Sequence, residues 1–265
     1  MEKTNQNEME YMILKKHWID TWLSQEEMDF LLQACSGPEH KENYSYSLAG
    51  NISKSELIRD KDNWFYESVL KKLTERIYYR DWDNYYKYHI EKEEPLPKFE
   101  LKTLWVNYQK QYEFNPLHDH GGLYSFVIFM KIPTHWEEQH ALPISANSNS
   151  PLASDFSFIW AGEEAAVRND YVCTENFPLS LEDEGRMLFF PAWLKHQVYP
   201  FYGTEEERVT ISGNIDLYDP NRPKMQEVFA GEYKQKENML KMLENSVQQF
   251  KEELKEMKKA GENVE

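Results

Sequence analysis

The chain has 265 residues, of which 46 are acidic and 30 basic, and its formal net charge is −16. This length allows one large domain or two small ones, and the acidity argues against nucleic acid as a partner, because phosphate binding needs a basic surface. The start is polar, no apolar run is long enough to cross a membrane, and two distant cysteines do not form a disulfide framework, so the composition predicts a cytoplasmic protein without a membrane span.

The first 98 residues are expected to form a helical region that packs on the rest of the protein. Ser24 and Glu27 have the spacing of a capping box, in which a serine caps the first turn and a glutamate three residues later bonds back to it. Residues 1–35 are therefore expected to be helical. A second helix is expected from Ser55 to about Tyr79, where large apolar residues recur at helical spacing.

From Phe99 the apolar period changes to that of strands, and residues 99–219 predict a mainly β core. Several short apolar stretches separated by turns favour an antiparallel barrel or a roll of two sheets. The expected strands are 99–108, 124–132, 156–160, 166–173, 187–190 and 208–215. A long insertion, residues 134–154, separates the second strand from the third and is a candidate lid, since long connections are often functional.

Residues 220–265 are expected to form a helical extension with one long helix over 223–260. Its apolar residues recur at alternating spacings of three and four and are flanked by lysines and glutamates: Leu240, Leu243, Val247, Phe250, Leu254 and Met257. This pattern suits either a helix laid along the outside of the sheet or a coiled-coil contact with a second copy, which would make a homodimer. The division 1–98, 99–219 and 220–265 is expected to give one compact domain overall.

Three histidines are candidate metal ligands. His118 and His120 lie two residues apart, so in an extended segment both point to one face while Asp119 points to the other. His196 ends a strand-like run of large apolar residues that would exclude water. A lone strand histidine is more often a structural or surface residue, but neutral imidazole is the commonest protein ligand of divalent transition metals. The three together predict a mononuclear metal site.

Arg208 is the candidate anchor for an anionic co-substrate. It shares a strand face with Thr210, and a planar guanidinium fork beside a hydroxyl suits a carboxylate in a partly buried site. The plainer interpretation is a surface salt bridge, because three glutamates precede it directly.

These motifs, in this order, resemble a known enzyme family. The stretches are Asn107-Tyr108-Gln109, Asn115-Pro116-Leu117-His118-Asp119-His120, Ser125-Phe126-Val127-Ile128, Phe190-Pro191 and Arg208-Val209-Thr210-Ile211-Ser212-Gly213-Asn214. Together they resemble the Fe(II)/2-oxoglutarate-dependent dioxygenases. More narrowly, they resemble a branch of 2-oxoglutarate/iron oxygenases from phage and marine bacterial genomes that is distantly similar to prolyl hydroxylases. The resemblance covers about residues 100–216.

The resemblance implies a double-stranded β-helix (jelly-roll, cupin-like) core with flanking helices, and it implies Fe(II), 2-oxoglutarate and O2 as cofactor and co-substrates. The expected reaction hydroxylates a C–H bond of an unidentified substrate, a peptide prolyl or a small metabolite, and releases succinate and CO2. His118 matches the first metal ligand and His196 the distal one. Arg208 matches the residue that pairs with the far carboxylate of 2-oxoglutarate, with Thr210 as the accompanying hydroxyl. Tyr108 resembles a tyrosine that some relatives place on the co-substrate.

The chain departs from the family at the third ligand. The usual triad is two histidines and one carboxylate, but the carboxylate position is His120 here. Three alternatives follow: a three-histidine site, a site in which Asp119 swings in, or a site with two protein ligands only.

Two other functions share these residues. One is a cupin-like, zinc-dependent hydrolase or isomerase that would not bind 2-oxoglutarate. The other is a non-catalytic protein that assembles through the 223–260 helix.

Overall fold

The computed structural model describes residues 17–37, 42–81, 87, 90–92, 96–161, 172–219, 238–252 and 255. Contacts divide the chain into two units, Met1–Tyr218 and Asp219–Glu265, and each is described by itself. The boundaries expected at residues 98/99 and 219/220 stay predictions. Among the described residues, no helix is both long and apolar enough to cross a membrane.

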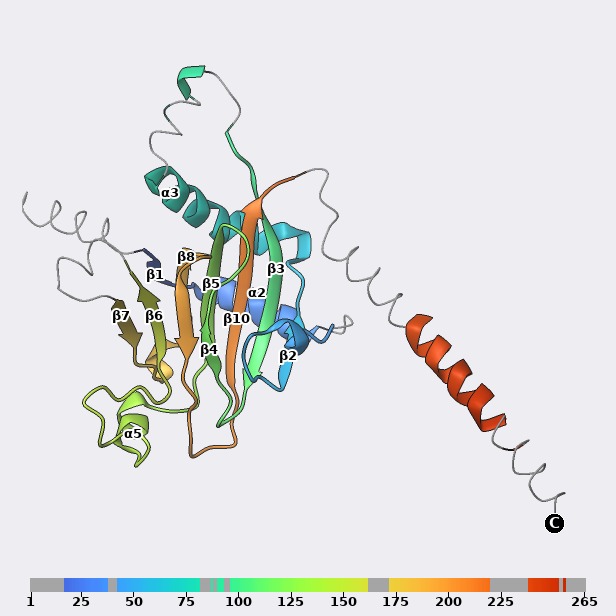
Figure 1. Ribbon diagram of the computed structural model, residues 1–265. Helices are drawn as coiled ribbons and strands as arrows, with labels where there is room; N and C mark the ends of the chain where they lie inside the picture. The colour runs from blue at the N-terminus through green and yellow to red at the C-terminus, as the bar shows by residue number, and fades with distance from the viewer. Residues whose placement is uncertain are drawn as a thin grey trace, which may run out of the picture. The chain divides into compact units, whose positions relative to one another are not determined.

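Two antiparallel sheets form the first unit (Figure 1). The larger sheet has six strands in the order β1 (Ile19–Trp22), β8 (Arg186–Pro191), β5 (Tyr124–Lys131), β10 (Arg208–Leu217), β3 (Phe99–Gln109) and β2 (Lys54–Leu57). The smaller sheet has four strands in the order β4 (Asn115–His118), β9 (Lys195–Val198), β6 (Phe156–Trp160) and β7 (Cys173–Phe177). The expectation of a mainly β protein with flanking helices is confirmed.

Helices of the first unit come mostly from the N-terminal third of the chain. They are α2 (Gln25–Ser36), α3 (Lys71–Asp81) with the preceding π-helical turn η3 (Tyr66–Leu70), α5 (Trp136–Ala141), and the 3-10 turns η1 (Ser45–Ser47), η2 (Lys61–Asn63) and η4 (Leu181–Asp183). The predicted capping box opens α2: the Glu27 amide donates to the Ser24 hydroxyl, and the Ser24 amide donates to the Glu27 carboxylate at 2.7 Å. Such a box provides hydrogen-bond acceptors for amides at the start of the helix, which have no carbonyl partner within it.

Two hydrophobic cores lie on opposite faces of the larger sheet. On one face, apolar side chains of α2, η3 and α3 pack against the strands; they include Leu31, Phe65, Leu70, Ile77, Val106, Ile128 and Ile211. On the other face, the two sheets pack on each other through Val127, Phe129, Phe156, Phe158, Phe177, Leu188 and Phe190. The central strands are thus buried on both sides, which is why β3 shows no simple alternation of apolar and polar residues.

Strand β10 lies at the centre of the larger sheet, between β3 and β5. At Gly213 an added Cβ would lie 2.6 Å from the Phe126 ring and 2.7 Å from the Thr103 carbonyl, so only glycine fits there. Because strand side chains alternate, the even-numbered residues of β10 face the smaller sheet, and the polar ones among them form one wall of the site described below.

Two N-terminal expectations were wrong. Residues 19–22 form β1 and not helix, and Ser55 lies in β2 and does not cap a helix. The Ser55 hydroxyl is buried and donates to the Asn107 side chain of the neighbouring strand at 2.8 Å. The helix starts after Asp60, whose carboxylate accepts from the amides of Phe65 and Tyr66, both at 2.8 Å.

Two further expectations concern the strand over 166–173 and the 134–154 insertion. Of the strand expected over 166–173, residues 166–171 lie outside the described residues, and β7 begins at Cys173. The 134–154 insertion has structure of its own: it contains α5, and the buried Gln139 side chain exchanges two hydrogen bonds of 2.9 Å with the backbone of Tyr202. It is therefore tied to the loop before β10 and is not a free loop.

In the second unit, residues 238–252 and 255 are helical. The rest of the helix expected over 223–260 lies outside the described residues. Several large apolar side chains of this helix are exposed, among them Leu240, Leu243, Val247 and Phe250.

Candidate metal centre

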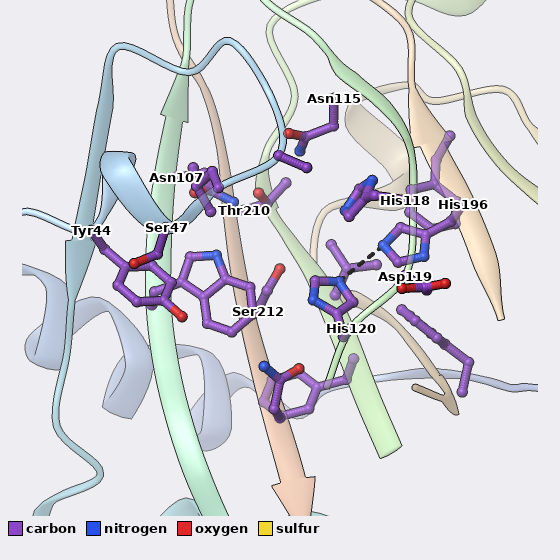
Figure 2. Close-up of a pocket in the computed structure, with 18 residues that line it drawn as sticks. Tyr44, Ser47, Asn107, Asn115, His118, Asp119, His120, His196, Thr210 and Ser212 are labelled. Atoms are coloured by element: carbon purple, nitrogen blue, oxygen red, sulfur yellow. Dashed lines mark hydrogen bonds between the residues drawn. The ribbon is translucent and has the colours of Figure 1, made fainter. Parts of the chain in front are cut away.

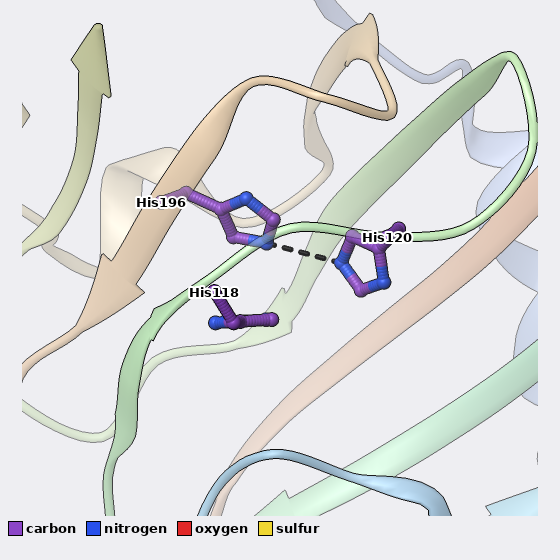
Figure 3. A group of neighbouring side chains, drawn as sticks. All are labelled: His118, His120 and His196. Carbon is purple, nitrogen blue, oxygen red and sulfur yellow. Dashed lines mark hydrogen bonds between the residues drawn. The ribbon is translucent and has the colours of Figure 1, made fainter.

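Strand pairing brings the three histidines together. His118 ends β4 and is the Cα partner of His196 in β9. Two residues far apart in the chain thus lie side by side on neighbouring strands of the smaller sheet. The amide of His120 donates to the Ala192 carbonyl at 3.0 Å, which fixes the chain two residues beyond β4. Figure 3 shows the three rings turned toward a common space.

The ligand atoms of the three rings lie within 4.8 Å of one another. The Nε2 atoms of His120 and His196 are 3.1 Å apart. One ion could bond to both nitrogens at about 2.1 Å across this separation. Two ligands of one ion are at most about 4.2 Å apart, so the looser pairs have to close slightly around a metal.

Backbone carbonyls set the tautomers of two rings. Nδ1 of His118 lies 2.7 Å from the Pro116 carbonyl, and Nδ1 of His196 lies 3.0 Å from the Leu194 carbonyl. A carbonyl only accepts, so both Nδ1 atoms carry the proton and both Nε2 atoms are unprotonated; Nε2 of His196 accepts a hydrogen bond from Nε2–H of His120. This carbonyl–histidine arrangement is the usual support of a metal-binding histidine.

Burial keeps the three rings neutral. It lowers the pKa of His118 and, together with the neighbouring His118 ring, lowers the pKa of His120 to about 4. The pKa of His196 falls well below its ordinary value for the same reason, as this ring is 4% exposed and packs against Phe156 and Phe190. Neutral imidazole is the form that binds a metal, so the donor set fits a divalent transition ion.

Asp119 is turned away from this cluster. Its exposed carboxylate accepts from the Lys195 ammonium at 2.9 Å, and this hydrogen bond lowers the pKa of Asp119. Of the two candidates for third ligand, the described structure therefore brings His120 and not Asp119 to the other histidines.

A pocket of about 140 Å³ opens beside the histidines (Figure 2). An engineered cavity of about 150 Å³ holds benzene, so this volume suits one small molecule. One wall is polar and comes from the centre of the larger sheet; it includes Asn107, Thr210, Ser212 and Asn214. The N-terminal loop around η1 contributes Tyr44 and Ser47, which sequence reasoning did not place at the site.

Arg208 lies on the same face of β10 as Thr210 but does not line the pocket. Its side chain is 0% exposed, and the NH2 group donates to the Ser154 carbonyl at 2.9 Å and to the Ser154 hydroxyl. The ring of Phe201 lies 5.1 Å from the guanidinium carbon, and Nε has no hydrogen-bond partner among the described residues. Burial lowers the pKa of Arg208 to about 10, so it is cationic at neutral pH.

The other two expected co-substrate residues lie apart. Thr210 lines the pocket, as does its Cα partner Asn107. Tyr108 points to the opposite, helix-packed face of β3, with the Lys54 ammonium 4.0 Å from its ring centre. The expected contact between Tyr108 and the co-substrate has no support in this geometry.

Strand alternation was the signal for the residues that the sequence prediction missed. On β10, every second residue after Arg208 and Thr210 gives Ser212 and Asn214. On β3, the same alternation places Asn107, and not Tyr108, on the pocket face. No local signal pointed to Ser154 as the partner of Arg208, because the two residues meet only through the tertiary fold.

One family model matches part of the chain. The family described as "Putative 2OG-Fe(II) oxygenase" matches residues 103–214. The matched segment runs from β3 into β10 and contains His118, His120, His196 and Arg208.

Comparison with other proteins gives weaker likenesses. No curated protein matches the sequence. A prolyl-4-hydroxylase from Pseudomonas putida is 11% identical, with a TM-score of 0.41 over 77% of this chain and 95% of that one. A viral collagen prolyl hydroxylase from Paramecium Bursaria Chlorella virus-1, in a 2OG complex, is 11% identical, with a TM-score of 0.39 over 76% and 96%. HygX from Streptomyces hygroscopicus, with nickel and 2-oxoglutarate bound, is 10% identical, with a TM-score of 0.39 over 79% and 86%. None of the residue roles proposed below depends on these likenesses.

The third ligand is testable with Co(II), whose visible absorption reports its ligands. We expect His120→Ala to lower Co(II) affinity at least tenfold, since one of three imidazoles is lost, and Asp119→Asn to change it by less than about twofold. Metal titration followed by absorption measures both. The reverse order of effects would make Asp119 the ligand.

The buried histidines also predict a pH dependence of stability in the metal-free protein. Their pKa values are lower in the folded chain than the ordinary 6.5, and for His120 the value is about 4. Below pH 6.5 the unfolded chain therefore binds more protons, and the free energy of unfolding falls as the pH drops toward 4. Between pH 7 and 4.5 the part due to His120 is roughly 1–3 kcal/mol.

Denaturant unfolding at the two pH values measures this loss. It should be smaller in His120→Asn than in wild type by that amount. His135→Asn, a change at a half-exposed histidine, should leave it unaltered. Equal losses in wild type and His120→Asn would contradict the assignment.

Proposed function

We propose that this protein is a 2OG-Fe(II) oxygenase, the family whose model matches residues 103–214, and that His118, His120 and His196 hold its iron. The observation that carries the proposal is the convergence of three neutral imidazoles beside a small pocket. The protein is thus an Fe(II)- and 2-oxoglutarate-dependent oxygenase, and the roles of its residues follow from their positions.

The protein supplies orientation and dryness at the metal. The carbonyls of Pro116 and Leu194 hold the rings of His118 and His196 with Nε2 free for the ion. The rings of Phe156 and Phe190 pack on His196 and keep water from that side. Bound Fe(II) with 2-oxoglutarate supplies the O2 activation that yields succinate, CO2 and oxidation of a substrate C–H bond.

The co-substrate would lie along the polar wall formed by β3 and β10. Thr210 and Asn107 offer neutral hydrogen-bonding groups within the pocket. Arg208, two residues before Thr210 on the same face, is the one described arginine next to this wall, and its unpaired Nε fits the far carboxylate of 2-oxoglutarate. In the structure its guanidinium bonds to Ser154 and does not line the pocket.

The two facing antiparallel sheets, with a pocket beside their shared core, support a double-stranded β-helix of the jelly-roll type. Hydroxylation of a C–H bond in a peptide prolyl or a small metabolite remains the proposed reaction class. The cytoplasmic setting and the lack of a nucleic-acid partner remain predictions from composition.

Three histidines also suit Zn(II), which keeps a zinc-dependent hydrolase as the second candidate. A zinc-dependent hydrolase would use the same metal site, but its reaction does not require an arginine that binds a dicarboxylate. The test below separates the two.

We expect anaerobic addition of Fe(II) and then 2-oxoglutarate to produce the visible metal-to-ligand charge-transfer band of the chelate. Arg208→Gln should weaken 2-oxoglutarate binding by about tenfold or more, because a charged hydrogen bond is lost, while Fe(II) binding stays within about twofold. Titration of the band measures the first and chelator competition the second. A wild-type protein that binds Zn(II) tightly and shows no band with Fe(II) would favour the hydrolase.

We also propose that the C-terminal helix pairs with a second copy. Its exposed apolar residues Leu240, Leu243, Val247 and Phe250 follow coiled-coil spacing. Leu243→Lys should give a monomer, because it buries a charge in the seam, whereas Gln248→Lys, outside the seam, should stay dimeric. Light scattering after size exclusion measures the mass. A wild-type monomer at every concentration would refute this contact.

A further inference from the structure

The buried guanidinium of Arg208 has more donors than acceptors. Arginine carries five N–H groups. The NH2 group donates to the carbonyl and the hydroxyl of Ser154, NH1 lies at a long 3.5 Å from the Gln109 side-chain oxygen, and Nε finds no partner in the part of the chain that the structure describes. A buried cation left short of acceptors is costly, so this arrangement is suited to receive an anion.

The counter-charge in the protein is indirect. Asp155, 1% exposed, acts on Arg208 electrostatically, but its carboxylate forms its 2.8 Å hydrogen bond with His140. The atoms that touch the guanidinium are therefore the neutral oxygens of Ser154 and Gln109. A carboxylate would bind it more strongly than either, because charge-assisted pairs are about twice as strong as neutral ones.

Ser154 is held in place at the cost of backbone strain. It lies in the turn Leu152–Asp155, which is closed by the Asp155 amide donating to the Leu152 carbonyl at 3.1 Å. Its φ is +74°, a value that favours glycine. The Ser154 amide donates to the Pro200 carbonyl at 2.9 Å, which keeps the turn against the loop before β10. Strain of this kind persists where the surroundings impose it and is common at functional sites.

We propose that Ser154 is a positioning residue that holds Arg208 out of the pocket and gives up its hydroxyl contact when the far carboxylate of 2-oxoglutarate binds. The inference rests on the proposed function and adds a role for the 134–154 insertion, of which Ser154 is the last residue. The insertion thereby sets the affinity for the co-substrate without touching it.

The proposed exchange and a purely structural role of Ser154 predict different effects on the affinity for 2-oxoglutarate. In the free protein the Ser154 hydroxyl stabilises Arg208, but in the complex the carboxylate takes that place. Removing the hydroxyl therefore destabilises the free protein and leaves the complex almost unchanged. The variant should be less stable and yet bind 2-oxoglutarate more tightly.

Ser154→Ala tests the exchange. Anaerobic titration of the charge-transfer band of the Fe(II)-loaded protein should show 2-oxoglutarate binding about tenfold tighter than in wild type, the worth of one hydrogen bond to a charged group. Denaturant unfolding of the metal-free protein should show lower stability. Ser154→Gly serves as a second variant, since it also lacks the hydroxyl and tolerates the positive φ, and it should bind with the same tightened affinity.

Two controls locate the effect. Ser157→Ala removes another buried hydroxyl, one that bonds to Asn176 at 2.8 Å, and should lower stability without changing affinity. 2-Oxobutyrate has the keto acid but no far carboxylate, so its affinity should not respond to Ser154→Ala.

Unchanged or weaker 2-oxoglutarate binding in both Ser154 variants, with wild type still forming the band, would overturn this inference alone. Equal tightening of 2-oxobutyrate would also overturn it, because the gain would then not involve the far carboxylate. Failure of wild type to form the band at all would remove the proposed function and this inference with it.

Discussion

The site depends on the pairing of two short strands, β4 and β9. Each has four residues, and their register is irregular between Asn115 and His118. So short a ladder adds little stability by itself, and its geometry is imposed by its neighbours: β6 pairs with the other edge of β9, and the rings of Phe156 and Phe190 pack on His196. The apolar core between the sheets thus holds the imidazoles in position, and the same rings that stabilise the fold keep these candidate metal ligands dry and neutral.

The polar wall is a consequence of the same two-sheet arrangement. Strand β10 contributes to the helix-packed core with its odd-numbered residues, such as Ile211 and Ile215, and faces the smaller sheet with Thr210, Ser212 and Asn214. Polar residues in the middle of a sheet would be costly in a fully packed core. Here the two sheets leave a pocket at that place, and these polar residues line it.

The sequence was enough for the parts of the fold that local rules govern. The capping box at Ser24, the β core, and the long strands before and after the histidines were all predicted from spacing and composition. Ser55 misled the helix prediction because a serine looks the same in the sequence whether it begins a helix or bonds across an edge strand. That choice is made by its tertiary partner Asn107, which no local pattern reveals.

For the site, spacing and the order of motifs predicted the three histidines and the arginine, and the structure brings the three histidines together. Sequence did not reveal how Arg208 is held. Its contact with Ser154 joins residues 54 positions apart, and its burial follows from the packing of the insertion against the loop before β10. Tyr108 is the opposite case. The family resemblance suggested it as a co-substrate residue, whereas two-residue alternation from Trp105 and Asn107 places its side chain on the other face of β3.

On the proposed function, charge balance would couple binding of the metal to binding of the co-substrate. Three neutral imidazoles bring no negative charge to a divalent ion, and the Asp119 carboxylate accepts a hydrogen bond from the Lys195 ammonium instead. On the proposed function, an ion alone would place two positive charges against the aromatic wall at His196, which is costly in so dry a site. A doubly charged 2-oxo diacid cancels them, and its far end meets the cation Arg208 beside Asp155. Each ligand therefore reduces the cost of burying the other, and by linkage the coupling acts equally in both directions. The histidine at the third position would thus make metal retention depend on the co-substrate more than a carboxylate there would.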